Sequence, residues 1–348
     1  MSLKQLSALA GLLTALFATT TRANVTFNLL PEDGTPQYAI DGFTAAANRW
    51  SAALADNITV NVQIGFSSLG TSVIAQSGSA FLERSYSEVR TVLGTHRTSA
   101  GDYSSTAALQ PGSSYARLIN HTSNSPNGPN SATPYVDTLN LVGLTTANAK
   151  ALGLIGPGSS LDALIRFNAD LAFDFDPANG LTAGQYDFIG AAAHELGHAL
   201  GFVSGVDDID TSGGDYPGQN FSSNLLDLFR YSTLSLAAGP GVTDYTADNR
   251  AKYFSVDGGT TSLALFANGV VNGEGVQASH WKDMLGLGIM DPTAFPGEQL
   301  VISNNDLLAF DVLGYTLIPE PGTAALLSLG ALLLGFRRPV RRSGFGVD

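Results

Sequence analysis

The feature that most constrains this chain is a pair of histidines, His194 and His198, four residues apart in a strongly apolar stretch. On an α-helix, positions i and i+4 lie on one face, so both imidazoles can point at a single metal ion. Apolar residues would surround the pair on nearly every side of such a helix: Phe188, Ile189, Ala191, Ala192, Ala193, Leu196, Ala199, Leu200 and Phe202. These apolar residues predict that the helix is buried, and burying histidines without hydrogen-bond or metal partners is energetically costly. A metal site therefore explains the stretch better than a surface helix with two solvated histidines.

The glutamate after the first histidine suggests what such a metal ion does. Glu195 sits about 100° around the helix from His194, where it need not bind the metal. From there it can accept a proton from a water molecule whose pKa a zinc ion has lowered. The five residues match the H-E-x-x-H pattern of zinc metalloproteases. We therefore expect His194 and His198 as zinc ligands and Glu195 as the general base.

The expected helix runs from about residue 184 to residue 200. Thr182 and Gln185 have capping-box spacing at its start. Gly201 can end it, because glycine tolerates a left-handed backbone. Gly197, inside the helix, costs about 1 kcal/mol relative to alanine. We therefore expect another segment to approach the helix closely at Gly197, beside the metal.

A catalytic zinc ion usually takes three protein ligands and a water molecule, so a third ligand must come from elsewhere. The chain has no cysteine, and the candidates are His280, Asp207, Asp208, His96 and His121. We prefer His280, which lies ten residues before Met290 in a chain with only three methionines. The alternative for His280 is a structural role, packed on the neighbouring Trp281.

These residues resemble the metzincin metalloproteases. Many metzincins carry the third histidine six residues after the second, but Ser204 stands at that position here. The chain is more similar to the leishmanolysin-like branch, in which the helix reads H-E-x-x-H-x-x-G-F and the third histidine comes much later, before a turn containing methionine. It also resembles a group of bacterial PEP-CTERM metalloproteases. The matching positions, within about residues 160–315, are His194, Glu195, His198, Gly201, Phe202, His280, Trp281 and Met290.

The resemblance implies an α+β fold of the zincin, metzincin-like type. A twisted sheet and the active-site helix would form an upper subdomain above the cleft, about residues 24–203. Residues 204–318 would form a mostly irregular or helical lower subdomain. Met290 would provide an apolar floor beneath the metal without binding it. The lack of cysteines departs from the disulfide-rich eukaryotic members of the family.

The N-terminal end of the chain predicts export. Residues 1–23 have the three parts of a secretory signal peptide. Lys4 supplies positive charge, residues 6–18 are apolar, and Ala23 ends a small-residue cleavage site. The mature protein would begin near Asn24.

The C-terminal end, residues 319–348, has three parts of its own. Pro319-Glu320-Pro321 precedes an apolar segment, residues 322–336, and a cluster of arginines. The apolar segment is shorter than the usual span of about 20 residues, although a thin membrane can accommodate it. This order resembles the bacterial PEP-CTERM sorting signal. It implies a Gram-negative cell, transient anchoring in the inner membrane, a membrane-embedded sorting enzyme, and delivery to the cell surface or extracellular matrix.

Composition narrows the partners and cofactors. The net charge is −13 and no basic stripe occurs outside the C-terminal tail, which argues against nucleic acid as a partner. Without cysteine there are no disulfides. Aspartate-rich and glycine-rich segments at residues 174–180 and 207–213 are candidates for Ca²⁺ binding, with a solvated turn as the simpler interpretation.

Periodicity and turn residues predict the remaining elements. The expected helices are residues 41–56, 86–93, 223–236 and 303–313; the expected strands are residues 57–66, 161–167 and 171–175, with a hairpin over residues 253–269. The second and third strands could pair with each other, or form one edge strand beside the cleft. An extended peptide substrate could join such an edge by strand addition.

These observations predict a secreted, surface-sorted zinc endopeptidase that acts on a protein or peptide substrate. His194, His198 and His280 would hold one zinc ion, which polarises the scissile carbonyl. Glu195 would act as general base and then pass the proton to the leaving amine. The alternative is a non-catalytic surface or matrix protein with a structural zinc site. Glu195 discriminates between them, because a structural site needs no base and usually has four protein ligands.

Overall fold

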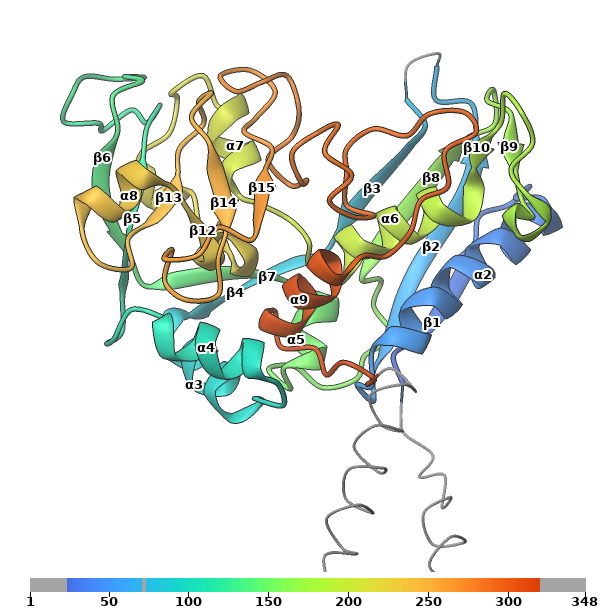
Figure 1. Ribbon diagram of the computed structural model, residues 1–348, viewed down its shortest axis with the longest axis horizontal. Helices are drawn as coiled ribbons and strands as arrows, with labels where there is room; N and C mark the ends of the chain where they lie inside the picture. Colours follow the sequence, from blue (N-terminus) through green and yellow to red (C-terminus); the bar gives the residue numbers. More distant parts are fainter. Residues whose placement is uncertain (1–23, 71–72, 320–348) are drawn as a thin grey trace, which may run out of the picture.

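The computed structural model describes residues 24–70 and 73–319 (Figure 1). The expected signal peptide, residues 1–23, and the apolar segment, residues 322–336, lie outside these residues, as does the rest of the sorting tail after Pro319. Within the described residues, no helix combines the length and the apolar character that crossing a membrane requires. The described chain has a mixed α+β architecture, as expected.

A four-stranded sheet organises the half of the molecule that contains the paired histidines. Its strand order is β1-β2-β8-β3, with β1 Thr26–Pro31, β2 Thr59–Ser67, β8 Ala163–Asn168 and β3 Ala75–Ser79. β1, β2 and β8 are parallel, whereas β3 runs antiparallel to β8 and forms one edge. The strand expected over residues 57–66 is confirmed as β2. It is buried on both faces instead of one, because it lies inside a parallel sheet.

Two helices, α2 (Gln37–Ala53) and α6 (Phe188–Leu200), pack against each other and against this sheet (Figure 1). The buried face of α2 includes Phe43, Ala46 and Trp50, which confirms the amphipathic helix expected there. The helix begins at Gln37, after Pro36, four residues earlier than the expected start at residue 41.

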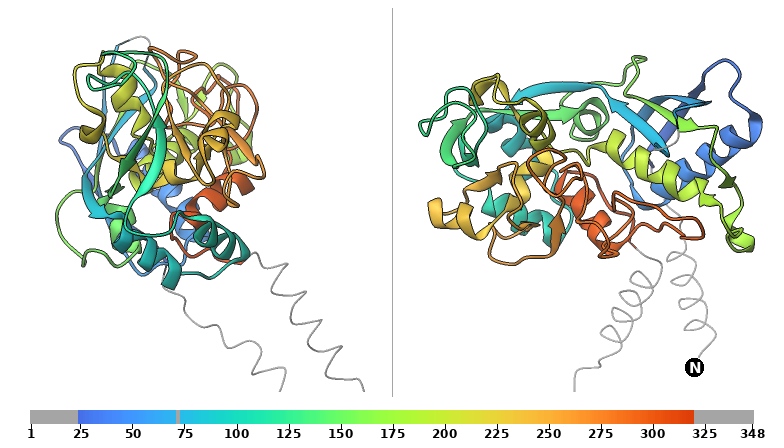
Figure 2. Two further views of the ribbon diagram at one scale, coloured as in Figure 1. Left: turned by 90° about the vertical axis from the view of Figure 1, so that its left-hand side faces the viewer. Right: turned by 90° about the horizontal axis from the view of Figure 1, so that it is seen from above.

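Three three-stranded sheets occupy the other half of the described molecule (Figures 1 and 2). Their strand orders are β11-β7-β4, β13-β5-β6 and β12-β14-β15. The bounds are β4 Phe81–Ser85, β5 Tyr115–Ile119, β6 Tyr135–Leu139, β7 Leu141–Thr145, β11 Ser223–Asn224, β12 Arg230–Tyr231, β13 Thr243–Tyr245, β14 Lys252–Phe254 and β15 Ala264–Phe266. Because β11 pairs with β7 and β13 pairs with β5, two of these sheets combine strands from both sides of residue 203, the boundary expected between subdomains.

The remaining helices are short. They are α3 Tyr86–Thr95, α4 Ala100–Ala108, α5 Thr146–Ala151, α7 Val206–Thr211, α8 Thr233–Ala238 and α9 Asn304–Val312. Helices α3 and α9 confirm the predictions at residues 86–93 and 303–313. Each begins after a serine, Ser85 or Ser303, whose side chain accepts a backbone N–H of the first turn. The antiparallel pair β14 and β15 confirms the expected hairpin.

The single helix expected over residues 223–236 is wrong. The segment contains β11, a 3-10 turn at Leu225–Phe229, β12 and only then α8. The Asp227 carboxylate accepts the backbone N–H of Gly205 at 2.9 Å, β11 pairs with β7, and β12 pairs with β14. Hydrogen bonds to distant segments therefore replace those of a continuous helix.

The strand expected over residues 171–175 is also mostly wrong. Only β9, Phe173–Asp174, forms there, and it pairs in parallel with β10, Tyr186–Asp187. The strand expected over residues 161–167 is β8, which lies inside the sheet between β2 and β3. Neither alternative for these two strands is therefore correct: β8 does not pair with β9, and the edge of the sheet is β3.

Candidate metal centre

Helix α6 places the first two histidines. Its N-cap is Asp187, whose carboxylate accepts the backbone N–H of Gly190 at 2.8 Å. The cap expected at Thr182 is therefore wrong, and the helix starts four residues later than predicted. Gly201 ends the helix with φ of +121°, a backbone conformation that favours glycine, as expected.

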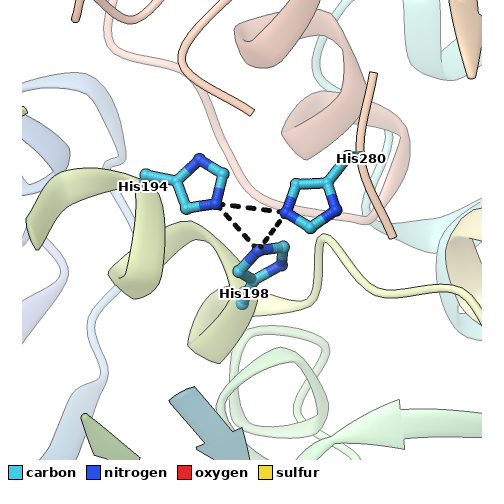
Figure 3. A group of neighbouring side chains, drawn as sticks. All are labelled: His194, His198 and His280. Carbon is cyan, nitrogen blue, oxygen red and sulfur yellow. Dashed lines mark hydrogen bonds between the residues drawn. The ribbon is translucent and has the colours of Figure 1, made fainter. Parts of the chain in front are cut away.

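His280 meets the other two histidines although it is 82 residues beyond His198 (Figure 3). The Nε2 atoms of His198 and His194 are 3.1 Å apart, those of His198 and His280 are 3.2 Å apart, and those of His280 and His194 are 3.3 Å apart. Of the five candidates for the third ligand, His280 is the one that the structure brings to the pair. The three side chains lie close enough together to bind a metal ion.

The second nitrogen of each ring, Nδ1, faces a backbone carbonyl oxygen. The distances are 2.7 Å from His194 to Ile289, 2.7 Å from His198 to Phe202 and 3.3 Å from His280 to Gln277. A carbonyl oxygen only accepts, so Nδ1 is the atom that donates in each of these contacts. In the tautomer with its single proton on Nδ1, each ring directs an Nε2 lone pair toward the other two. Metal-binding histidines are held in this way, and a cation at the centre would relieve the repulsion.

The dimensions and protonation of the group also fit a metal ion. With metal–nitrogen bonds of about 2.0–2.1 Å, tetrahedral angles separate two ligand atoms by about 3.3 Å. The observed separations, 3.1 to 3.3 Å, are close to that value. Burial, reinforced by the neighbouring imidazoles, lowers the pKa of His198 to about 3 and that of His280 well below its ordinary value. Both rings are thus neutral, which is the form that binds a metal.

The other four candidate ligands lie elsewhere. His96 caps the C-terminal end of α3, and His121 Nδ1 lies 3.0 Å from Asn130 Oδ1. The Asp207 carboxylate accepts backbone N–H groups, and Asp208 is exposed. None of them belongs to the histidine group.

In the two segments considered for Ca²⁺, three carboxylates, those of Asp174, Asp207 and Asp210, accept backbone N–H groups. Residues 206–211 form α7 instead of a loop, and Asp210 accepts the N–H of Val271 at 2.7 Å. Asp174 accepts the N–H groups of Asp176 at 2.8 Å and Thr182 at 2.7 Å, which holds the pKa of Asp174 below its ordinary value. In the described part of the chain, the three histidines are the one group of three or more His, Asp or Glu side chains arranged to hold an ion.

Met290 lies fully buried against α6. A Cβ atom built on Gly197 would lie 2.5 Å from Met290 Sδ, so the absence of a side chain at Gly197 makes this contact possible. The close approach expected at Gly197 is therefore confirmed. The Met290 carbonyl also accepts the Trp281 N–H at 2.9 Å, which ties the turn to the segment that carries His280.

A buried carboxylate that the sequence analysis did not single out holds this turn in place. Asp306, fully buried, accepts the N–H groups of Ile289 at 2.8 Å and Met290 at 3.3 Å and the indole N–H of Trp281 at 2.8 Å. Its only sequence signal is capping-box spacing after Ser303. That spacing predicts a helix cap and says nothing about the turn beneath the histidines.

The three Nε2 atoms open into a cleft of about 560 Å³. Residues 73–77, which include the start of β3, line one side of it, and residues 291–295 line another. Glu195 also lines the cleft, where it is 9% exposed. None of the described hydrogen bonds involves its carboxylate, so Glu195 can interact with water or a substrate there.

No protein-family model, curated protein or solved structure matches this chain.

Proposed function

We propose that this protein is a zinc-dependent endopeptidase with a zincin, metzincin-like fold. The observation that carries the proposal is the convergence of three histidine Nε2 atoms at an open cleft that the Glu195 carboxylate also lines. Three imidazoles with a free fourth position are a ligand set of catalytic zinc sites, whereas structural sites usually fill all four positions with protein ligands.

The residues around the site support peptide hydrolysis. Bound zinc would supply Lewis acidity, lowering the pKa of a water molecule and polarising the scissile carbonyl. Glu195 takes the proton of the attacking water and delivers it to the leaving amine nitrogen. The carbonyls that accept from the three Nδ1 atoms hold the rings in the tautomer that presents Nε2. Met290, packed at Gly197, supports the helix from below.

The edge strand supports a peptide as the substrate. β3 is the last strand of the four-stranded sheet, and residues 73–77 line the cleft. An extended peptide can add to such an edge as a further strand, held by main-chain hydrogen bonds that do not depend on its sequence. An edge strand within residues 161–175 was one of the two alternatives considered from the sequence, and this proposal assigns that role to β3 instead.

The proposed location of the protein is the cell surface or extracellular matrix of a Gram-negative bacterium, after transient anchoring in the inner membrane. It rests on the sequences of residues 1–23 and 319–348. Val25 donates to the Leu54 carbonyl at 3.2 Å and Ile318 donates to the Ala53 carbonyl at 2.8 Å, so both ends of the described chain leave beside the end of α2 (Figure 1). Fractionation of cells should find chains that retain residues 319–348 with the membrane, and a chain ending at residue 318 in the soluble fraction.

The deciding experiment compares wild type with Glu195→Gln. Hydrolysis of fluorescently labelled casein should fall by about 10²–10⁴-fold, because the general base is lost. Zinc content, measured on the same samples, should not change. Glu88→Gln, an exposed glutamate on α3, is the control and should retain full activity. Inactivity of wild type and variant alike, with zinc bound and any pro-segment removed, would favour the non-catalytic surface protein.

A further inference from the structure

We infer that Asp207 is a positioning residue of the metal centre, whose carboxylate fixes the segment that delivers His280. The inference rests on the proposed metal function of the three histidines. Asp207 was itself a candidate ligand in the sequence, but its oxygens are occupied. Oδ1 accepts the Ala278 N–H at 2.6 Å, and Oδ2 accepts the Ser279 N–H at 3.1 Å and the Ser279 hydroxyl at 2.5 Å. These are the two residues directly before His280.

Such a clamp compensates for the distance of His280 along the chain. A third histidine at position 204 would be held near the first two by the backbone itself. His280 instead lies 82 residues beyond His198, and closing this longer loop has a larger entropic cost. The position of the His280 ring must therefore be fixed by other contacts. Ser204 occupies the position of the nearer ligand, and its N–H donates to the Ser279 hydroxyl at 2.9 Å. The structure therefore brings the distant loop back to the place where a short motif would have supplied its ligand.

The base of the clamp is fixed by a second carboxylate. Asp227, almost fully buried, accepts the Ser204 hydroxyl at 2.6 Å and the Gly205 N–H at 2.9 Å. This holds the turn between α6 and α7, and with it the position of Asp207 relative to the histidines on α6. The path from α6 to His280 is thus a chain of hydrogen bonds between carboxylates and backbone or serine groups.

Asp210 offers a matched control on the same helix. It also accepts two backbone N–H groups of a distant loop, from Val271 and Asn272, each at 2.7 Å. That loop lies several residues before His280, so loss of the Asp210 contacts removes a comparable clamp without releasing the ligand itself. A purely structural role for Asp207 predicts that Asp207→Asn and Asp210→Asn behave alike.

The test measures zinc affinity by competition with a chromophoric chelator, on proteins whose folding has first been checked by circular dichroism without metal. Asp207→Asn should weaken zinc binding by about 10- to 100-fold, the usual effect of losing a residue that orients a ligand. Asp210→Asn should keep wild-type affinity even if its unfolding midpoint falls. The visible absorption of the cobalt(II) form, which reports the ligand set, should change in Asp207→Asn alone.

The possible outcomes distinguish the positioning role of Asp207 from the proposed metal function. If Asp207→Asn does not fold, Ser279→Ala replaces it: it removes the hydroxyl contacts to Asp207 and Ser204 and should weaken zinc binding by a smaller factor. Wild-type affinity and an unchanged cobalt spectrum in the folded variants would overturn the positioning role and leave the metal site intact. Failure of the wild type to bind zinc or cobalt would instead refute the proposed function itself.

Discussion

Replacing Gly197 with alanine tests whether the turn of Met290 packs against the active-site helix as described. An alanine Cβ would lie 2.5 Å from Met290 Sδ, 3.2 Å from Met290 Cε and 3.4 Å from Trp50 Cζ2. All three are shorter than the optimal contact of about 3.5–4.0 Å. The contact with Trp50 is close to an ordinary van der Waals contact, whereas the one with Met290 Sδ requires an atom to move. Met290 and Trp50 are both fully buried, so neither can move into solvent to make room.

Two opposing effects set the magnitude. Alanine gains about 1 kcal/mol over glycine in a helix interior. Forcing an extra methyl group into a packed core costs about 1–3 kcal/mol. The balance is a destabilisation of about 1 kcal/mol, in a position where helix propensity alone predicts stabilisation. Displacement of Met290 should also move the neighbouring Ile289 carbonyl, which accepts from His194, and so weaken zinc binding.

Urea unfolding of the metal-free protein, followed by circular dichroism, measures the effect. The control is Gly94→Ala in α3, where a Cβ would meet no atom within 4 Å. That variant should gain up to about 1 kcal/mol from helix propensity alone. In a Met290→Ala background, Gly197→Ala should also become stabilising, because its obstacle has been removed. If Gly197→Ala stabilises the wild-type protein as much as Gly94→Ala does, the packing of Met290 described here is wrong.

Four further substitutions test the structure. Burial raises the pKa of Asp311 to about 6, so protonation of its carboxyl favours the folded state. The free energy of unfolding of the wild type, relative to that of Asp311→Asn, should therefore rise as pH falls from about 7 to about 5. Urea titrations that give both proteins the same dependence of this free energy on pH would contradict the prediction. Lys150 and Asp162 form a buried ion pair at 2.6 Å, so Asp162→Asn should cost about 3–5 kcal/mol by leaving the ammonium without its partner. Glu32→Gln, which breaks a half-exposed ion pair, should cost less than about 1 kcal/mol in the same unfolding assay. His280→Ala should lose bound zinc in elemental analysis, and unchanged metal content would place the third ligand elsewhere.

The sequence by itself determined the features that depend on neighbours within one or two helical turns. The spacing of His194 and His198 implied a shared helix face, and Ser303 marked the start of α9. Gly197 predicted a close contact but did not identify its partner. The low helix propensity of glycine shows that the residue is unfavourable there, but not which segment of the chain packs against it. The scarcity of histidine and methionine also favoured His280 and Met290, but only as the best of several candidates.

Tertiary structure alone decided which distant groups meet. The segment from residue 223 to residue 231 left the helical conformation because β11 and β12 pair with strands far away in the sequence. Asp207 could have bound a cation or backbone N–H groups, and the fold supplied the N–H groups of Ala278 and Ser279. A carboxylate is suited to either partner, so its role depends on which donors the folded chain brings within reach, and that is a property of long-range contacts.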